Sequence, residues 1–213
     1  MMKALIIGAT GATGKDLVRV LLQDSDYREV VIFVRKPSGM NHPKLTEVIT
    51  DFSNLEDVSR FITGDVWFSL LGTTLKAAGS KDKQWHIDYE IPAAFGEIAK
   101  QNGVSTAVLL SAYGAATSSN VFYSKMKGSL EDKISTLSFE KYIIFRPGLL
   151  LRKNTDRLGE RISGGILQFL NAVGVLRKFR PMPTAVLAQK MSRAPRFFEN
   201  GKHIIALNKI FEL

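Results

Sequence analysis

The chain has 213 residues, of which 45% are hydrophobic and 23% charged, as in a globular protein with a sizeable buried core. It contains no cysteine, which excludes disulfides, thiolate metal sites and thiol catalysis. The net charge is +9, and residues 151–213 carry 12 Lys and Arg against 4 Asp and Glu. This basic part fits an anionic ligand, nucleic acid or a membrane surface, and it fits a solvated basic face equally well.

The N-terminal residues run straight into an apolar strand and lack the layout of a signal peptide, so we expect a cytoplasmic protein. No uncharged apolar stretch reaches the roughly 20 residues that a membrane-spanning helix needs. We expect no metal, because His42, His86 and His203 have no ligand spacing. Nucleic-acid binding is not expected either, since the basic tail is not interleaved with an aromatic stacking platform.

Apolar, β-branched runs alternate with helical patterns, which predicts an α/β fold with a doubly wound parallel sheet. We expect one domain over 1–213, with a dinucleotide-binding core over 1–150, a small substrate-side or lid segment over 151–202 and a returning strand and tail over 203–213. The predicted strands are Lys3–Ile7, Glu29–Val34, Leu45–Thr50, Asp65–Leu71, Ser105–Ser111, Tyr142–Arg146 and His203–Leu207. The predicted helices are Lys15–Gln23, Leu55–Ile62, Asp88–Asn102, Tyr123–Ser135, Gly159–Leu176 and Ala185–Phe198.

The first strand is followed by the glycine-rich stretch GATGATG, with GxxGxxG spacing. Glycine lets the backbone turn sharply and approach a ligand closely. The N–H groups at the start of the next helix then face the ligand, with the positive end of the helix dipole behind them. This pattern predicts a site for the diphosphate of a dinucleotide. The residues expected there are Gly8, Thr10, Gly11, Ala12, Thr13 and Gly14.

In a doubly wound sheet the ligand lies at the carboxyl ends of the strands. The second strand ends in Arg35 and Lys36, with no acidic residue in the strand-end stretch. An acid would bind the ribose hydroxyls of NAD, whereas an arginine suits the 2′-phosphate of NADP. NADP(H) is therefore favoured over NAD(H), although Arg35 also fits a solvated strand-end charge.

The third and fourth strands end in residues that fit both a coenzyme site and ordinary turns. Asp51 could accept a bond from the adenine amino group, with Phe52 against the ring, or Asp51 could cap a turn. Leu71, Gly72 and Thr73 allow the backbone to approach the nicotinamide half of the coenzyme. A plain turn is the alternative there.

The fifth strand ends in Ser111, followed by Tyr123 and, four residues later, Lys127. Residues at i and i+4 share one face of a helix. The lysine can then stabilise a developing tyrosinate, while Ser111 holds a substrate carbonyl oxygen. We predict these three as catalytic residues, and Tyr123 and Lys127 also as coenzyme contacts. Asp88 is expected to cap the predicted helix Asp88–Asn102.

The sixth strand leads into Pro147, Gly148 and Leu149. Proline fixes this backbone and glycine permits close contact, so the turn could form a wall against the nicotinamide, or it could be purely structural. Further on, segment 159–180 contains an apolar stripe followed by basic residues. It predicts a lid over the substrate pocket, with a protein or peripheral membrane contact as the less favoured alternative.

Together these residues resemble the short-chain dehydrogenase/reductase superfamily in its atypical branch. The stretches LGTT, SSNVFYSKMKG and FRPGLLL are similar to the Tat-interacting-protein oxidoreductases and their bacterial relatives. The resemblance implies a Rossmann fold and NADP(H) as coenzyme. Members commonly carry two serines at the end of the fifth strand, whereas Ala112 follows Ser111 here, and the C-terminal portion is short.

The predicted function is an NADP(H)-dependent oxidoreductase that acts on a small carbonyl or hydroxyl compound. In that reading Tyr123 donates the proton, Lys127 tunes Tyr123 and Ser111 polarises the oxygen. One alternative is an NADP(H)-binding redox sensor with little turnover, because the atypical branch includes proteins of this kind. The other is a flavin or biliverdin-type reductase, which shares the glycine turn without a Tyr–Lys pair.

Overall fold

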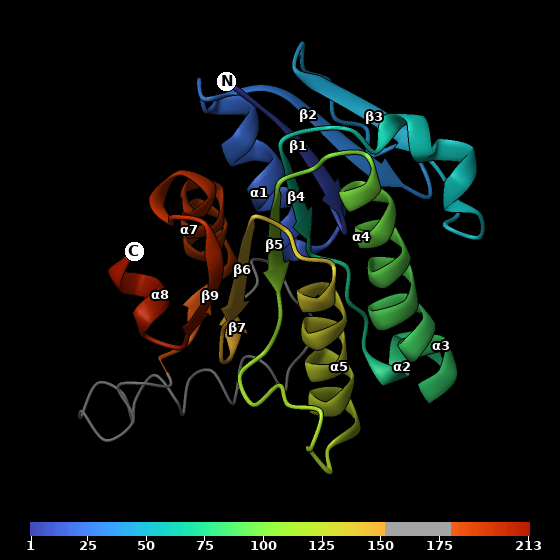
Figure 1. The fold of residues 1–213 in the computed structure, drawn as a ribbon, viewed down its shortest axis with the longest axis vertical. Helices are drawn as coiled ribbons and strands as arrows, with labels where there is room; N and C mark the ends of the chain where they lie inside the picture. Colours follow the sequence, from blue (N-terminus) through green and yellow to red (C-terminus); the bar gives the residue numbers. More distant parts are fainter. Residues whose placement is uncertain (152–179) are drawn as a thin grey trace.

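The computed structural model describes residues 1–151 and 180–213, and the predicted helix Gly159–Leu176 lies outside them. In this described part, seven strands form one parallel sheet in the order β3-β2-β1-β4-β5-β6-β9. Figure 1 shows the sheet between layers of helices. The strands are β1 (Met2–Ile7), β2 (Tyr27–Val34), β3 (Leu45–Ile49), β4 (Val66–Ser69), β5 (Thr106–Leu110), β6 (Lys141–Arg146) and β9 (Gly201–Ala206).

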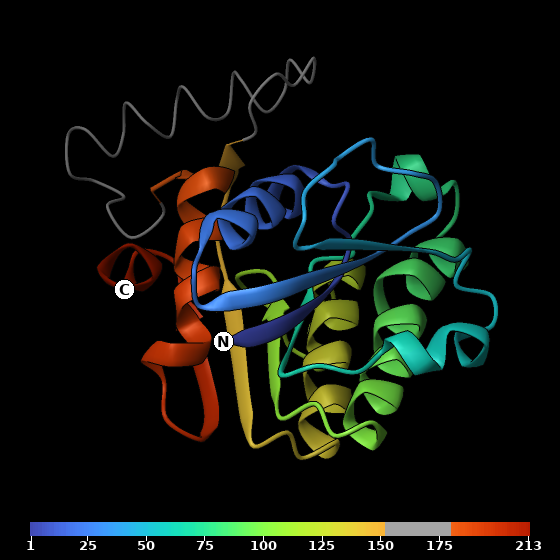
Figure 2. The same cartoon turned by 90° about the horizontal axis from the view of Figure 1, so that it is seen from above.

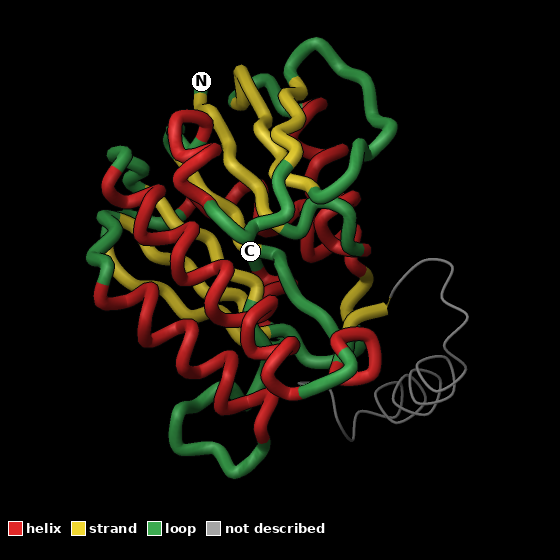
Figure 3. The backbone as a smooth tube through the Cα atoms, turned by 90° about the vertical axis from the view of Figure 1, so that its right-hand side faces the viewer, coloured by secondary structure: helices red, strands yellow, loops and turns green. Residues whose placement is uncertain are grey.

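The described helices cover both faces of this sheet, as Figures 2 and 3 show. Two short strands, β7 (Leu150–Leu151) and β8 (Met182–Pro183), pair separately. The helical elements are α1 (Ala12–Gln23), the 3-10 turn η1 (Leu55–Phe61), α2 (Leu75–Ala78), α3 (Lys81–Trp85), the π-helical turn η2 (His86–Glu90), α4 (Ile91–Gln101), α5 (Phe122–Thr136), α7 (Thr184–Phe197) and α8 (Lys209–Glu212).

The side chains of β1 alternate between two hydrophobic cores, one on each face of the sheet. Ala4 and Ile6 lie in the core that includes residues of α1 and α7. Leu5 and Ile7 lie in the core that includes residues of η1, α4 and α5. Burial on both faces explains why the central strands are near-continuous apolar runs. The predicted doubly wound sheet is confirmed.

Helix α7 joins the C-terminal part of the chain to the N-terminal helix. Leu187 and Met191 share a core with Leu17 of α1. The Thr184 hydroxyl donates to Asp16 Oδ2 at 2.7 Å, and the Tyr27 hydroxyl donates to the backbone oxygen of Ser192 at 2.8 Å. These contacts hold α7 against α1 and β2. The division of the chain at residue 150 stays a prediction.

The predicted helix Asp88–Asn102 differs at its start. Helical structure begins at α3, where the Ser80 hydroxyl accepts from the Lys83 N–H, and runs through the π-helical turn into α4. Pro92 has no N–H to donate to the carbonyl of Asp88, four residues earlier, and the π-helical turn lies directly before it. Asp88 therefore lies inside a helical stretch, and the prediction that it caps the helix is wrong.

Candidate functional site

The glycine loop connects β1 to α1, and two of its glycines are required by backbone packing. Gly8 has φ +82°, and a Cβ there would lie 2.4 Å from the carbonyl carbon of Leu70 at the end of β4. A Cβ on Gly14 would lie 2.1 Å from the carbonyl oxygen of Gly8. Helix α1 begins at Ala12, three residues earlier than the pattern predicted, because this packing draws the loop residues into its first turn.

Gly11 is the glycine that leaves space for a ligand. It is the N-cap of α1, it is exposed, and no side chain caps the helix there. The first turn of a helix has N–H groups without acceptors in the helix, and α1 has no acidic residue in this turn. An anion can therefore bind at this end of α1, favoured also by the helix dipole. The residues present fit a diphosphate.

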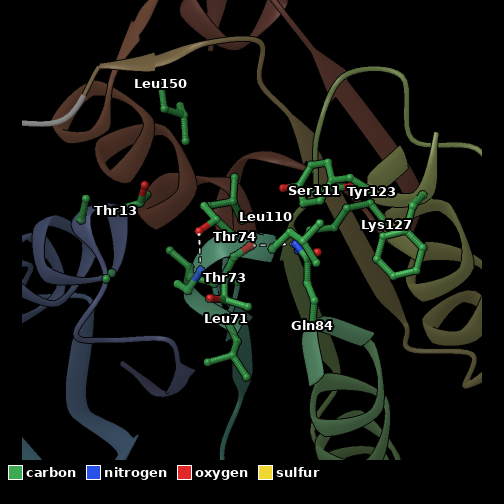
Figure 4. Close-up of a pocket in the computed structure, with 18 of the residues that line it drawn as sticks. Thr13, Leu71, Thr73, Thr74, Gln84, Leu110, Ser111, Tyr123, Lys127 and Leu150 are labelled. Atoms are coloured by element: carbon green, nitrogen blue, oxygen red, sulfur yellow. Dashed lines mark hydrogen bonds between the residues drawn. The ribbon is translucent and has the colours of Figure 1, made fainter. Parts of the chain in front are cut away.

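A cavity of about 640 Å³ opens at the carboxyl ends of β1, β4 and β5. Figure 4 shows its walls, with Thr13 on one side and Tyr123 and Lys127 on the other. The predicted site residues that line it are Gly11, Ala12, Thr13, Gly14, Leu71, Gly72, Thr73, Ser111, Tyr123 and Lys127. The structure thus brings the glycine loop and the predicted catalytic residues to one cavity.

Other predicted site residues do not line this cavity. They are Gly8, Thr10, Arg35, Lys36, Asp51, Phe52, Pro147, Gly148 and Leu149. Arg35 and Lys36 are exposed directly after β2. In the part of the chain that the structure describes, neither forms an ion pair with a carboxylate.

Asp51 and Phe52 form the turn after β3. Asp51 accepts from the N–H of Ser53 at 2.9 Å and from its hydroxyl at 2.6 Å, which lowers the pKa of Asp51. Phe52 has φ +67°, and its side chain is buried in the core with Leu55 and Val58. The turn role of Asp51 is therefore present in the structure. The adenine contacts of both residues stay predictions, and the ring of Phe52 is already occupied by core contacts.

The residues of the turn after β6, Pro147 to Leu149, make backbone hydrogen bonds and do not line the cavity. The carbonyl of Pro147 accepts from the N–H of Tyr113 at 2.9 Å, and that of Leu149 accepts from the N–H of Met182 at 2.9 Å. Gly148 is exposed. Leu150, one residue further on, does reach the cavity wall. A contact from this turn to a nicotinamide stays a prediction.

Helix α5 places Tyr123 and Lys127 on one face, as their spacing predicts. Tyr123 is 40% exposed at the cavity. Lys127 is buried, and its Nζ lies 5.9 Å from the centre of the Tyr123 ring. The ammonium therefore lies beneath a phenol that solvent can reach.

Asp88 is the partner of Lys127, which the sequence did not reveal. Its Oδ2 lies 3.7 Å from Lys127 Nζ, and its Oδ1 accepts from the N–H of Thr73 at 2.7 Å. Asp88 is fully buried, and burial raises its pKa although Lys127 and the Thr73 bond act in the other direction. A Cβ on Gly72 would lie 3.6 Å from Asp88 Oδ2 and 3.7 Å from Lys127 Nζ. A side chain at position 72 would thus contact both members of the ion pair.

A second buried pair lies beneath Ser111. The Ser111 hydroxyl donates to Glu131 Oε1, and Arg146 donates to both oxygens of the same carboxylate. These bonds raise the pKa of Arg146. Glu131 was not predicted, although it lies four residues after Lys127, on the same face of α5. That spacing is the signal that could have identified it.

Replacing Lys127 with methionine should make stability depend more strongly on pH. Asp88 would then be a buried carboxylate without a cation, which should cost about 3 kcal/mol of unfolding free energy at about pH 8. Its folded pKa, already raised, should rise further, so the folded state binds more protons than the unfolded state above the ordinary aspartate pKa of about 4. Stability should therefore fall as pH rises through this window and recover in acid. Urea unfolding at about pH 5 and about pH 8 measures this.

The matched control is the double variant Lys127→Met with Asp88→Asn, which has no carboxylate to titrate. It should lose the additional pH dependence. A Lys127→Met variant that follows the wild-type profile of stability against pH would contradict the coupling.

Comparisons with known proteins agree with this geometry. A family model described as NAD(P)H-binding matches residues 8–165. The protein FMP52-1, mitochondrial, of Scheffersomyces stipitis is 32% identical over 208 residues, covering 94% of this chain and 91% of that protein. The FMP52 protein, mitochondrial, of Saccharomyces cerevisiae is 32% identical over 169 residues, covering 78% and 73%.

Solved structures share the fold at low identity. A short-chain dehydrogenase/reductase superfamily protein from Agrobacterium tumefaciens with bound NAD gives a TM-score of 0.74 at 16% identity, covering 96% of this chain and 77% of that one. A UDP-N-acetylglucosamine 4-epimerase from Methanobrevibacter ruminantium gives 0.71 at 15% identity, covering 99% and 80%. These likenesses show the Rossmann fold that the resemblance implied.

The comparisons correct the predicted location. FMP52 proteins from Scheffersomyces stipitis, Candida albicans and Saccharomyces cerevisiae are all named as mitochondrial, so the cytoplasmic prediction is wrong. The prediction rested on the lack of a secretory signal-peptide layout, which does not distinguish between compartments inside the cell. Within residues 1–151 and 180–213, no helix has the length and apolar character needed to span a membrane.

The glycine loop, the parallel sheet and the matched family model lead to one assignment, and the resemblance found in the sequence is confirmed at this level. The chain belongs to the NAD(P)H-binding family, and it shares its fold with a short-chain dehydrogenase/reductase superfamily protein.

Proposed function

We propose that the protein is an NADP(H)-dependent oxidoreductase that interconverts a small carbonyl compound and its alcohol. The observation that carries this proposal is the shared cavity, in which the N-terminus of α1 faces the same space as Ser111, Tyr123 and Lys127. When bound, the nicotinamide coenzyme supplies or accepts the hydride. The residues of the chain supply binding, orientation and the proton.

Tyr123 is the proton donor for the carbonyl oxygen in the direction of reduction. Its exposure to the cavity allows it to contact a substrate and to regain a proton from solvent afterwards. The Lys127 ammonium beneath its ring stabilises the tyrosinate that forms. Asp88 holds Lys127 from the opposite side, and Ser111 contacts the substrate beside its reacting carbon.

The test is a screen of NADPH oxidation with aldehydes, ketones, quinones and flavins. Turnover of aldehydes or ketones is the expected result. Turnover of flavins alone would favour a flavin reductase, and tight NADPH binding without any turnover would favour a coenzyme sensor. Either of these outcomes would remove the proposed activity.

Arg35 should set the preference for NADP(H). Replacing it with alanine should raise the Kd for NADPH between about 10- and 100-fold, the effect of losing a hydrogen bond to a charged phosphate, and should change the Kd for NADH less than about twofold. Fluorescence titration with each coenzyme measures both values. Arg28→Ala is the matched control, because Arg28 lies near the start of the same strand, away from the carboxyl ends. Tighter binding of NADH than NADPH by the wild type would overturn the preference.

A further inference from the structure

The hydroxyl of Ser111 forms a hydrogen bond with one member of the ion pair between Glu131 and Arg146. Glu131 is 2% exposed. Its carboxylate accepts hydrogen bonds from the Ser111 hydroxyl and from Arg146, whose Nε lies 3.0 Å from Oε1 and 3.2 Å from Oε2. The Tyr142 hydroxyl donates to the backbone oxygen of Glu131 at 3.2 Å. The carboxylate is thus held by Ser111 and Arg146, whereas Tyr142 contacts only the backbone of Glu131.

These contacts determine where the hydroxyl hydrogen lies. A guanidinium is always charged and only donates, and an ionised carboxylate only accepts. Glu131 beside Arg146 is therefore the acceptor, and Ser111 must be the donor. A serine hydroxyl has one hydrogen and two lone pairs. The hydrogen points into the protein, so the lone pairs remain for the cavity that Ser111 lines.

We propose that Glu131 is a positioning residue which turns Ser111 into a hydrogen-bond acceptor, so that the site favours carbonyl substrates bearing a hydroxyl or N–H group beside the reacting carbon. The inference rests on the proposed oxidoreductase function. It changes the role expected from the sequence, in which Ser111 donates to the reacting carbonyl oxygen. That oxygen instead takes its hydrogen bond from Tyr123, whose side chain lines the same cavity.

Two acceptors facing each other leave one hydrogen bond unmade. A plain ketone therefore gains nothing from Ser111, whereas an α-hydroxy ketone donates its hydroxyl hydrogen there. The loss of one net hydrogen bond corresponds to a difference of about tenfold in kcat/KM. The hydroxy ketone should be the better substrate.

The experiment compares matched ketones with NADPH: acetone with hydroxyacetone, butanone with acetoin, and acetophenone with its α-hydroxy derivative. Wild type should favour the hydroxy member of a pair by about tenfold in kcat/KM. Ser111→Ala should remove this preference. Glu131→Gln should also remove it, by raising kcat/KM for the plain ketone, because the amide N–H₂ donates to Ser111 Oγ and the carbonyl oxygen of either member can accept the freed serine hydrogen.

This gain on the plain ketone separates positioning from support of the fold, because a destabilised enzyme would lose activity on both members of a pair equally. Tyr142→Phe is the matched control: it removes a buried hydrogen bond to the backbone of Glu131 and leaves the carboxylate intact. It should keep the wild-type preference.

Each of the remaining outcomes would contradict one specific part of the proposal. Wild-type turnover without a preference, or a preference that survives Ser111→Ala, would overturn the acceptor role while leaving the oxidoreductase standing. A Glu131→Gln variant that keeps the wild-type preference would overturn the role of Glu131. NADPH binding without turnover of any carbonyl would remove the proposed function, and this inference with it.

Discussion

Replacing Tyr123 with phenylalanine should lower kcat for carbonyl reduction by about a thousandfold, the scale of general acid catalysis. The change removes one hydroxyl and keeps the ring above Lys127. Because the side chain is 40% exposed, the substitution leaves the core intact. The Kd for NADPH should therefore change less than about twofold. Absorbance of NADPH measures turnover, and fluorescence titration measures the Kd.

Tyr113→Phe is the control for this experiment. Tyr113 is also an exposed tyrosine, at 49%, and lies outside the cavity wall, so its variant should keep wild-type turnover. Equal turnover of wild type and Tyr123→Phe would remove Tyr123 as the proton donor. A Tyr123→Phe variant that loses NADPH binding would instead show that the phenol holds the coenzyme.

Replacing Gly14 with alanine should prevent stable folding or lower the unfolding free energy by about 4 kcal/mol or more. A Cβ there would lie 2.1 Å from the carbonyl oxygen of Gly8 and 2.9 Å from backbone atoms of Ala9. No side-chain rotation can relieve a contact between a Cβ and backbone. The loop and the first turn of α1 would have to separate. Urea unfolding, or the soluble yield if the variant does not fold, measures the effect.

Gly11→Ala separates this packing role from ligand binding. Its Cβ would lie 3.3 Å from the carbonyl oxygen of Gly8, and its φ of −70° suits alanine. Stability should therefore fall by less than about 1 kcal/mol. The added methyl narrows the approach to the helix N-terminus, so the Kd for NADPH should rise by about tenfold or more. A Gly11→Ala variant with wild-type affinity would mean that the diphosphate does not lie against this loop.

The fold was predictable because the central strands are buried on both faces and consist of apolar runs. Parallel strands also end at one edge of a sheet, so Gly11, Gly72 and Ser111 could be assigned to one site before any distance was known. The i, i+4 rule placed Tyr123 beside Lys127 for the same reason. Both rules follow from backbone geometry, so they can be applied to the sequence of a single strand or helix.

The buried partners could not be predicted in this way. Asp88 lies two residues after the exposed His86, at the start of the predicted helix, so its residue type suggests a cap. Only the fold brings it to Lys127, 39 positions later in the chain. Glu131 reaches Ser111 and Arg146 from another element in the same manner. Contacts between elements decide which charges are paired, and the pairing decides what a catalytic group offers to a ligand.

The packing of α7 on α1 has a consequence for how the protein is made. Residues that cover the first helix arrive from the ribosome only after residue 184, and the strand that completes the sheet follows at residues 201–206. Until then, Leu17 and its apolar neighbours on α1 pack only against the sheet and lack the contacts that Leu187 and Met191 supply. A nascent chain with its glycine loop already synthesised would thus still expose apolar surface on this helix. Ribosome-bound chaperones would be expected to bind that surface until translation ends.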